Sequence, residues 1–507
     1  MLAVSRRARL TSSILVAAGI AAASLAVRAP ALDRAFTIDE KLWLERSDRF
    51  VSAVANARFG DTVESGHPGV TTMWVGGLAQ KTLPRDAGLR ERYERARLAV
   101  AIVSTALIVL VWWLVSVLAG GLAALLAGVL LAFDPFLLTH GRVLHLDGFL
   151  SLLMLASFLA LLAAVRTGER RMLVVSGAVA GLAALTKQPA ALLIPAVLVL
   201  LWRDEGDVWR RFGIWLGVAA VVAFVLWPAL WVRPWHAFAI MAGGSGRAVA
   251  ETSSAGFFLG RKTGNPGPLF YPVVLALRTS IISLPGIVLA AVWAVRRRKA
   301  SEDARLGLAL LSFALMFVVF LTVAPKKADR YVLPAIVAAD VALAVGAAQA
   351  IERSRRFSKP VVFAATGVVA MALHGAPAMA LSPYQNAYYN WLVGGPAAAQ
   401  HAMVIGWGEG LDEAAEHLND LSRSEKLTVA VSRVTQFDDF FVGRTIRIED
   451  SSLARTGGLK ADYVLFYISS VQSGKYEAIW HKYRRKTPIY ELRKNLISLV
   501  RVYRIED

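Results

Sequence analysis

The sequence predicts a polytopic α-helical membrane protein with a small α/β domain at its C-terminal end. Three observations carry this prediction. Apolar residues make up 56% of the 507 residues. They recur in runs of about 15–25 residues, which is long enough to cross the hydrocarbon core of a bilayer. This pattern stops near Ser382, after which the apolar stretches have the shorter length that is typical of strands.

About eleven apolar runs have the length of a membrane span. They are Thr11–Val27, Arg97–Ala119, Gly121–Leu138, Gly148–Val165, Met172–Lys187, Pro189–Trp202, Phe212–Trp231, Tyr271–Val295, Leu306–Val323, Tyr331–Ile351 and Pro360–Ala380. The first run could also be a cleaved signal peptide, because Ser24-Leu25-Ala26 fits a cleavage site. Its length exceeds the roughly 7–15 residues of a signal core and favours a retained span.

Basic residues in the short connections predict the orientation of the chain. With eleven spans, five basic clusters fall on the same side, which we expect to be cytoplasmic. They are Arg6, Arg7 and Arg9; Arg166, Arg170 and Arg171; Arg203, Arg210 and Arg211; Arg296, Arg297, Arg298 and Lys299; and Arg353, Arg355, Arg356 and Lys359. The N-terminus is then inside the cell membrane, and the C-terminal domain lies outside it.

The net charge of +19 does not indicate a nucleic-acid partner. Residues 382–507 contain 16 Lys and Arg against 15 Asp and Glu, so the basic excess lies in the membrane region. Phospholipid head groups explain an excess there. The chain has no cysteine, which excludes disulfides and thiolate metal sites.

We divide the chain into a membrane domain, residues 1–381, and a domain outside the membrane, residues 382–507. Two long external segments are expected at about 28–95 and 232–270, and the glycine content of the second is typical of a surface or lid loop. In the C-terminal domain the pattern predicts a helix at 411–421 and strands at 427–431, 445–448, 461–468 and 498–505. The glycines at 406–410 lack the spacing of a dinucleotide-binding loop.

Adjacent carboxylates, Asp39 and Glu40, follow the first span. A carboxylate at the membrane surface could act as a general base on an acceptor hydroxyl. The competing interpretation is that Asp39 caps a helix that starts near Glu40.

The short connection before the fourth span holds Arg142, His145 and Asp147. Asp147 could cap the span that follows it. The crowding of three polar residues in so short a loop favours a site instead, in which Asp147 orients the acceptor or shares a divalent cation with Asp39.

Basic residues on the external side suggest an anionic ligand. Lys187 lies in a turn between two short spans, where a lysine is costly unless it pairs with an anion or snorkels to the interface. Lys326, Lys327, Arg330 and Tyr331 form a basic loop that violates the positive-inside rule, and a phosphate is its natural partner. General contact with lipid head groups is the alternative.

Two weaker candidates complete the set. His67, before Pro68, could contact a phosphate or a metal, or could close a turn. Asp340 lies inside the tenth span, where an ionisable residue is expected to face the interior of the bundle.

Together these motifs resemble the GT-C type of membrane glycosyltransferase, within the group of protein O-mannosyltransferase and aminoarabinose transferase relatives. The shared features are the acidic pair, His67-Pro68-Gly69, Arg142…His145-x-Asp147, Leu185-Thr186-Lys187-x-Pro189, Pro325-Lys326-Lys327-x-x-Arg330-Tyr331 and the stretch from Tyr388 to Pro396. They cover about residues 1–421. Aminoarabinose transferases have Lys-Pro-Pro where this chain has His67-Pro68-Gly69.

The resemblance implies a sugar donor on a polyprenyl phosphate, transfer to an acceptor protein, lipid or glycan at the outer face, and inversion at the anomeric carbon. It implies that Asp39 is the base, that Asp147 is the second acid, and that Lys187, Lys326 and Arg330 hold the lipid phosphate. Two other classes remain open: a transporter or flippase for an anionic lipid-linked glycan, and a non-catalytic scaffold that displays the C-terminal domain. A flippase would favour inverted repeats, and the sequence has none that we detect.

Overall fold

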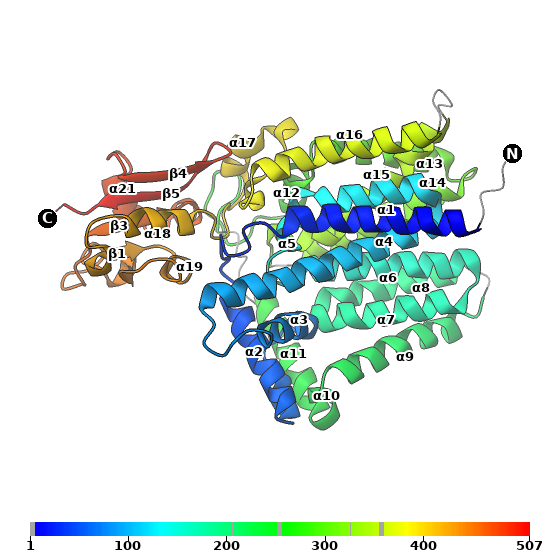
Figure 1. Cartoon of the computed structure of the whole chain (residues 1–507), viewed down its shortest axis with the longest axis horizontal. Helices are drawn as coiled ribbons and strands as arrows, with labels where there is room; N and C mark the ends of the chain where they lie inside the picture. Colours follow the sequence, from blue (N-terminus) through cyan, green and yellow to red (C-terminus); the bar gives the residue numbers. More distant parts are fainter. Residues whose placement is uncertain (1–5, 205, 251–255, 325, 354–358, 507) are drawn as a thin grey trace.

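The computed structural model describes residues 6–204, 206–250, 256–324, 326–353 and 359–506. A bundle of long helices occupies one end of the molecule, and a sheet domain occupies the other (Figure 1). The predicted fold class, a helical bundle with a small C-terminal α/β domain, is confirmed. Arg355 and Arg356 of the fifth basic cluster and part of the predicted segment 232–270 lie outside the described residues.

The bundle and its connections contain the elements α1 (Arg6–Arg28), α2 (Glu40–Ala55), η1 (Phe59–Thr62), α3 (Val70–Gln80), α4 (Leu89–Phe133), α5 (Pro135–His140), α6 (Asp147–Thr167), α7 (Arg170–Thr186), η2 (Gln188–Leu192), α8 (Leu193–Trp202), α9 (Val208–Leu226), α10 (Ala229–Val232), α11 (Pro234–Ala250), α12 (Phe270–Arg278), α13 (Ser283–Arg297), α14 (Glu302–Val323), η3 (Asp329–Val332), α15 (Leu333–Arg353) and α16 (Lys359–Ala380). Helix α11 forms where the sequence predicted a surface loop.

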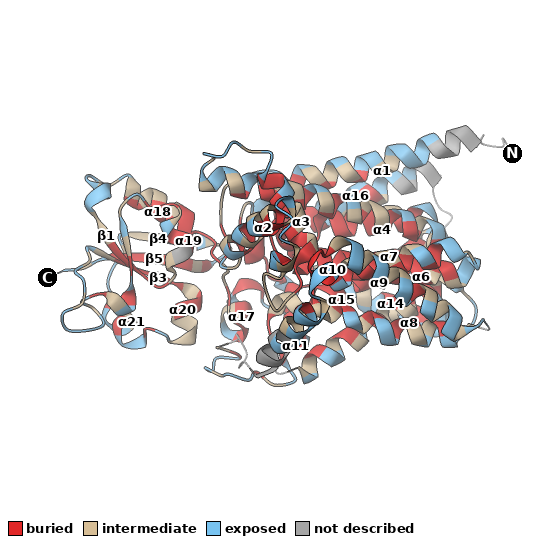
Figure 2. Ribbon diagram, turned by 90° about the horizontal axis from the view of Figure 1, so that it is seen from below, coloured by how far each residue is buried: buried red, intermediate tan, exposed pale blue. Residues whose placement is uncertain are grey.

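Within the described residues, six helices are long and apolar enough to span a membrane, and two bent helix pairs raise that number to at most eight. One pair is α12 with α13, bent by 111°, and the other is α16 with the turns that follow it, bent by 106°. The predicted number of eleven spans is therefore not confirmed. Helix α6 lies at the centre of the bundle and α9 at its periphery: 89% of the most apolar stretch of α6 is buried, against 6% for α9 (Figure 2).

Helix α4 holds two of the predicted spans, which meet at Gly120. Gly120 has φ 83° and ψ 178°, which breaks the helix, and glycine adopts such a positive φ at little cost. Arg97 near the start of α4 donates to the carbonyl of Leu32, while Arg28 donates to the carbonyl of Ala132 near its end. A straight helix would separate residues 97 and 132 by roughly 50 Å at 1.5 Å per residue. The chain must therefore double back at Gly120.

Two of the connections that carry predicted basic clusters lie side by side at one end of the bundle, where Arg170, Arg210 and Arg211 line the same cavity. Arg166 at the end of α6 donates to the carbonyl of Leu118 and lies 3.7 Å from Asp303 in the first turn of α14. In Figure 1 the N-terminus lies at this end and the sheet domain lies at the opposite end. This arrangement agrees with the prediction that the basic clusters lie on the same side of the membrane. That this side is cytoplasmic stays a prediction.

The C-terminal domain is a mixed five-stranded sheet in the order β2-β1-β3-β5-β4, with helices packed against it. Strand β1 pairs in parallel with β2 and β3, whereas β5 is antiparallel to β3 and β4. The strands are β1 (Thr428–Val431), β2 (Arg444–Arg447), β3 (Tyr463–Tyr467), β4 (Tyr490–Lys494) and β5 (Ile497–Arg504), and the helices and turns are η4 (Gln385–Ala387), η5 (Trp391–Val393), α17 (Gly395–Ala402), α18 (Leu411–Asn419), η6 (Ser424–Lys426), α19 (Val434–Asp438), η7 (Ile448–Asp450), α20 (Ile468–Ser473) and α21 (Glu477–Tyr483). The helix and four strands were predicted within a few residues; β4 was missed.

Ion pairs attach the C-terminal domain to the segment that carries Asp39. Arg34 Nε lies 2.7 Å from Asp412 Oδ2, and Lys41 Nζ lies 2.8 Å from Asp439 Oδ1. Tyr384 donates a second hydrogen bond of 2.8 Å to Asp412. These contacts hold the segment after α1 between the bundle and the sheet domain.

Candidate active site

Asp39 stands at the N-cap position of α2, but its side chain makes no capping hydrogen bond. Its Oδ2 instead lies 3.6 Å from His145 Nε2 and 3.5 Å from Arg330 Nη2. About one third of the side chain is exposed. The carboxylate does not cap the helix and is free to contact residues 145 and 330, which come from distant parts of the chain.

Glu40 points the other way and is buried. Its carboxylate receives hydrogen bonds of 2.7 and 2.5 Å from the guanidinium of Arg97. The backbone amides of Thr37 and Leu144 donate two more, at 2.8 and 2.9 Å. Glu40 therefore ties α2 to α4 and to the loop that carries His145, and both of its oxygens are already occupied.

Asp147, the first residue of α6, is the buried centre of the cluster. Its Oδ1 accepts a hydrogen bond of 2.6 Å from Lys187, and its Oδ2 lies 3.3 Å from both His145 Nδ1 and Arg330 Nε. Leu146, rather than Asp147, occupies the N-cap position of α6. Asp39 and Asp147 are therefore bridged by His145 and Arg330, so the structure brings both predicted acids into the same site.

Lys187 is held at the break between α7 and η2, where its extended backbone ends the helix. Its ammonium group also lies 4.4 Å from the ring centre of Tyr331, which adds a cation–π contact. The side chain is 7% exposed, so snorkelling to the interface does not describe it. The predicted Lys187, Arg330 and Tyr331 thus lie together beside Asp147.

His67 lies next to this cluster but binds Gln188. The distance between His67 Nδ1 and Gln188 Oε1 is 2.6 Å, and the amide of Gly69 donates to the carbonyl of Thr186 at 3.1 Å. Burial, and then the positive charge of Lys187, lower the pKa of His67. The imidazole is therefore neutral at neutral pH and fixes the Lys187 turn against the loop before α3.

Two of the predicted basic residues are used within the protein. Lys327 is buried, and its ammonium group donates to the carbonyls of Thr322 and Ala324 at 2.7 and 2.9 Å, which caps the end of α14. Arg142 is also buried and donates to the carbonyl of Ala31 at 3.0 Å. Lys326 is half-buried.

A cavity of about 280 Å³ opens onto Asp39 and Arg330. Residues of the bundle line it on one side, and Arg433, Gln436 and Tyr467 of the C-terminal domain line the other. Sequence reasoning did not identify these three residues, because isolated polar residues of a soluble domain carry no local signal that relates them to a membrane loop.

Trp407 is the largest feature that sequence reasoning missed. Its ring centre lies 5.2 Å from the ring centres of His140 and of His145, and 5.4 Å from the guanidinium carbon of Arg330. The glycines on either side adopt φ 89° and 126° and let the loop pass close to its neighbours. These glycines at 406–410 were noticed in the sequence; their spacing excluded a nucleotide loop and gave no other function.

Glu409 and Arg278 fix the cavity wall. Glu409 accepts hydrogen bonds of 2.7 Å from Tyr467 and 2.6 Å from Asn386. Arg278 pairs with Asp329 at 2.6 Å and donates to the carbonyl of Asn386 at 2.6 Å. Because Asp329 precedes Arg330, these bonds connect the basic loop to the segment after α16.

The cluster combines a partly exposed carboxylate, a buried carboxylate, an imidazole and two cations. Such a set can accept a proton at Asp39 and stabilise negative charge near Arg330 and Lys187. A divalent cation shared by Asp39 and Asp147 was one of two alternatives for this pair. His145 and Arg330 contact both carboxylates. Within the described residues, one group of side chains has donor atoms close enough together to hold a metal ion. It consists of Asp134, Asp340 and His374, which are buried in the bundle.

Residues 90–231 match the family model described as dolichyl-phosphate-mannose-protein mannosyltransferase. The matched segment runs from α4 to α10 and contains His145, Asp147 and Lys187. This match confirms the resemblance that the sequence motifs predicted. A search of curated proteins finds no match.

Solved structures of two membrane proteins are similar to the whole chain. ArnT from Cupriavidus metallidurans, crystallised with undecaprenyl phosphate, shares 14% identity over 98% of each chain with a TM-score of 0.48. The archaeal oligosaccharyltransferase AglB from Archaeoglobus fulgidus, in complex with an inhibitory peptide and a dolichol-phosphate, shares 14% identity over 92% of this chain and 71% of that chain, with a TM-score of 0.47.

Proposed function

We propose that the chain is an integral-membrane glycosyltransferase that moves a sugar from a polyprenyl-phosphate carrier to an acceptor hydroxyl. The observation that carries this proposal is the position of Asp39, partly exposed to a cavity and within 3.6 Å of His145 and Arg330. A base beside a cation meets the two needs of sugar transfer from a phosphate, which are a deprotonated acceptor and a stabilised leaving group. The description of the matched family, dolichyl-phosphate-mannose-protein mannosyltransferase, supports this donor class.

Asp39 is the general base. An acceptor hydroxyl in the cavity would transfer its proton to Asp39 while its oxygen forms a bond to the anomeric carbon. The bond between that carbon and the phosphate oxygen breaks, and its electron pair leaves with the phosphate. A single displacement of this kind inverts the anomeric centre.

Arg330 and Lys187 stabilise the phosphate as its charge grows. The Arg330 side chain is 24% exposed and reaches the cavity, whereas Lys187 stays behind it, bound to Asp147. Two cations near the departing oxygen lower the energy of a transition state in which negative charge moves onto phosphate. Lys326, in the same loop, is a further candidate contact for the phosphate.

Asp147 is a positioning residue. It is 1% exposed, so it acts through the three side chains that it holds rather than by contact with the acceptor. Its carboxylate keeps Lys187 and Arg330 together despite their like charge, and it supports the Nδ1 side of His145. His145 is then placed to share the proton that Asp39 receives.

The ring of Trp407 forms an apolar wall over this cluster, in contact with the rings of His140 and His145. A flat aromatic face suits the apolar face of a sugar ring. Arg433 and Gln436 of the C-terminal domain face the same cavity and would contact the acceptor or the sugar hydroxyls.

We also infer that the site faces the outside of the cell membrane. The basic clusters at the opposite end of the bundle support a cytoplasmic location for that end. The donor would then enter laterally from the outer leaflet.

The test is a donor panel with the purified full-length protein in lipid nanodiscs. Polyprenyl phosphates that carry different hexoses or pentoses are incubated with it, and release of free polyprenyl phosphate is followed by mass spectrometry. We expect turnover of one donor class, faster when a hydroxyl acceptor is added. The proposal is wrong if no donor is turned over and an intact donor instead crosses the membrane of sealed proteoliposomes. That result would indicate a flippase.

A further inference from the structure

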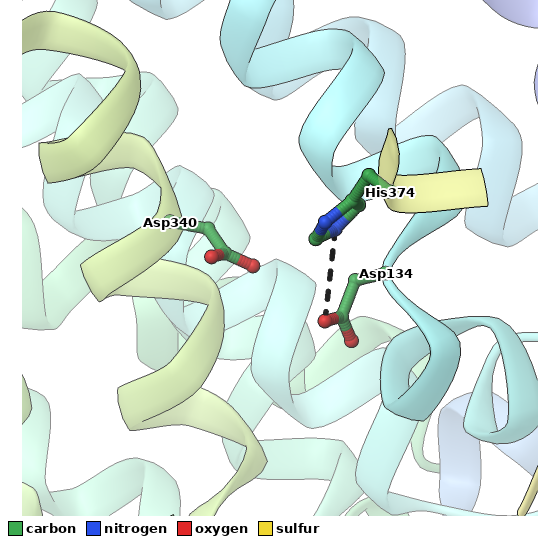
Figure 3. Close-up of side chains that lie close together, drawn as sticks. All are labelled: Asp134, Asp340 and His374. Atoms are coloured by element: carbon green, nitrogen blue, oxygen red, sulfur yellow. Dashed lines mark ion pairs between the residues drawn. The ribbon is translucent and has the colours of Figure 1, made fainter. Parts of the chain in front are cut away.

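A second group of buried polar side chains lies inside the bundle, outside the candidate active site. It consists of Asp134 at the junction of α4 and α5, Asp340 in α15 and His374 in α16 (Figure 3). None of the three side chains is accessible to solvent. One ligand atom from each lies within 4.8 Å of those of the other two. Figure 3 shows the two carboxylates and the imidazole directed into the same space.

The Ser283 hydroxyl lies beside Asp340, and the carbonyl of Leu130 lies beside His374. Four polar atoms that face this space nevertheless make no well-aligned hydrogen bond among the described residues. They are Asp134 Oδ2, both carboxylate oxygens of Asp340, and His374 Nε2. An unpaired carboxylate in such a place costs several kcal/mol, and a charge inside a membrane helix is costly for the same reason. Two buried carboxylates side by side, each with an oxygen that lacks a well-aligned hydrogen bond, therefore need a cation, or protons, between them.

The remaining polar atoms of Asp134 and His374 are held by hydrogen bonds outside the group. Asp134 Oδ1 accepts the amide of Leu137 at 2.7 Å, which caps α5. His374 Nδ1 lies 2.8 Å from Ser280 Oγ. A metal-binding histidine usually has its second ring nitrogen hydrogen-bonded in this way, because the bond fixes the orientation of the ring. The nitrogen Nε2 is thus left for the interior of the group.

Arg28 attracts the carboxylate of Asp134 electrostatically, but its guanidinium makes its hydrogen bonds elsewhere. Arg28 donates to the carbonyls of Leu131 and Ala132 at 3.2 and 2.8 Å, and to Ser24 Oγ at 2.9 Å. It forms no ion pair with Asp134 in the part of the chain that the structure describes. Inside the group, His374 Nε2 lies 3.8 Å from Asp134 Oδ2.

We propose that Asp134, Asp340 and His374 bind a divalent transition-metal ion of the zinc type that fastens three helices of the bundle. Two carboxylate oxygens and one imidazole nitrogen form a donor set that zinc accepts. Metal bonds of about 2.0–2.2 Å would place the donor atoms roughly 3.3–3.5 Å apart. The observed 3.8 Å between His374 and Asp134 needs only a small rotation of the side chains.

The location of the ion gives it a structural role. Helix α5 starts at Asp134 and leads to the loop that carries His145, and α15 follows the η3 turn that carries Arg330. An ion held between α5, α15 and α16 would therefore fix the spacing of two elements that form the candidate active site. This proposal does not depend on the reaction catalysed there.

The test measures metal in the full-length protein. The chain is purified in detergent through a tag without histidine, from cells grown with added zinc and manganese, and bound metals are counted by plasma mass spectrometry. We expect about one equivalent of one divalent metal per chain, and at least a tenfold loss in D340N and H374Q. D303N is the matched control, because Asp303 lies in α14 at the end near Arg166, and it should keep the metal.

A second measurement guards against variants that fail to fold. The wild-type protein is denatured in the presence of a chromophoric chelator, and X-ray absorption of the intact protein reports the ligands. Release of one equivalent, with nitrogen and oxygen neighbours near 2.0–2.2 Å as in zinc sites, supports the proposal. A wild-type protein with less than a tenth of an equivalent, or a D340N variant that retains full metal, overturns it in favour of protonated carboxyl groups.

Discussion

Adjacent residues can have opposite roles, as Asp39 and Glu40 illustrate. Both are carboxylates at the start of α2, and the sequence alone did not separate them. The structure gives Glu40 four short hydrogen bonds from Arg97, Thr37 and Leu144, whereas Asp39 keeps an exposed face toward the cavity. A base must be able to reach its substrate. Asp39 meets that requirement and Glu40 does not.

The first prediction concerns Glu40. The E40Q variant should unfold at a lower temperature, because the amide cannot pair with the buried guanidinium of Arg97. Removal of one partner of a buried ion pair costs about 3–5 kcal/mol. Thermal unfolding in detergent measures the change, with E45Q as the control, since Glu45 lies on the same helix and is half exposed. Normal stability combined with lost transfer would instead make Glu40 the base.

Sequence reasoning at this scale was most specific where residue type and membrane depth limited the options. Lys187, Asp147 and Arg330 were predicted to share a site; their side chains are in contact, and their roles stay predictions. It did not foresee that Lys327 would bind the end of α14, because a positive charge in a loop does not reveal whether it faces a ligand or backbone carbonyls. Arg278 was missed because its partner Asp329 lies 51 residues away.

The shape of the cavity depends on individual elements, and the loop at residues 406–410 shows this most clearly. Gly408 has φ 126°, and a Cβ there would lie 2.3 Å from the carbonyl oxygen of Phe36. Phe36 belongs to the segment that leads to Asp39. The loop that carries Trp407 thus packs against the segment that carries the proposed base, and only glycine permits this approach.

The second prediction is that G408A lowers the transfer rate at least tenfold while the bundle stays folded. The added methyl group must displace either the 406–410 loop or the segment before Asp39. Initial transfer rate and thermal unfolding are measured together. G457A is the matched control, since Gly457 also has a positive φ but would place its Cβ in open space. Equal losses in both variants would attribute the effect to backbone strain alone.

At this scale the sequence predicted most spans and strands but not how they combine. Gly120 separates two predicted spans, and the chain doubles back there so that the two halves of α4 run side by side. Helix α11 forms where a loop was predicted. Strand β4 was missed because Glu491, Arg493 and Lys494 give an edge strand little hydrophobic alternation. Pairing with β5 stabilises it, and that partner is not visible in a local pattern.

In the whole molecule, the elements that carry the candidate active site lie between the helical bundle and the C-terminal domain. The cavity has walls from the bundle and from the C-terminal domain, and the ion pairs of Arg34 and Lys41 hold the two together. The sequence predicted a helical bundle and a small C-terminal α/β domain, and the boundary drawn at residue 382 stays a prediction. It could not predict that they share a cavity, because that depends on contacts between residues roughly 400 positions apart.

The third prediction concerns orientation, and the absence of cysteine makes it simple to test. S422C in the C-terminal domain should react with a membrane-impermeant maleimide in intact cells. A300C, in the turn between α13 and α14, should react only after the membrane is opened. Both positions are exposed, and the wild-type chain is the unlabelled control. The reverse pattern would place the cavity on the cytoplasmic side.

The most direct test of the central claim is transfer by D39N with the donor identified in the panel. Asparagine keeps the shape of the side chain but cannot accept the proton, so we expect a loss of at least about 100-fold in turnover. The unfolding temperature and donor binding should stay close to those of the wild-type protein, and E45Q should transfer normally. Transfer by D39N at the wild-type rate would contradict the assignment of Asp39 as the base.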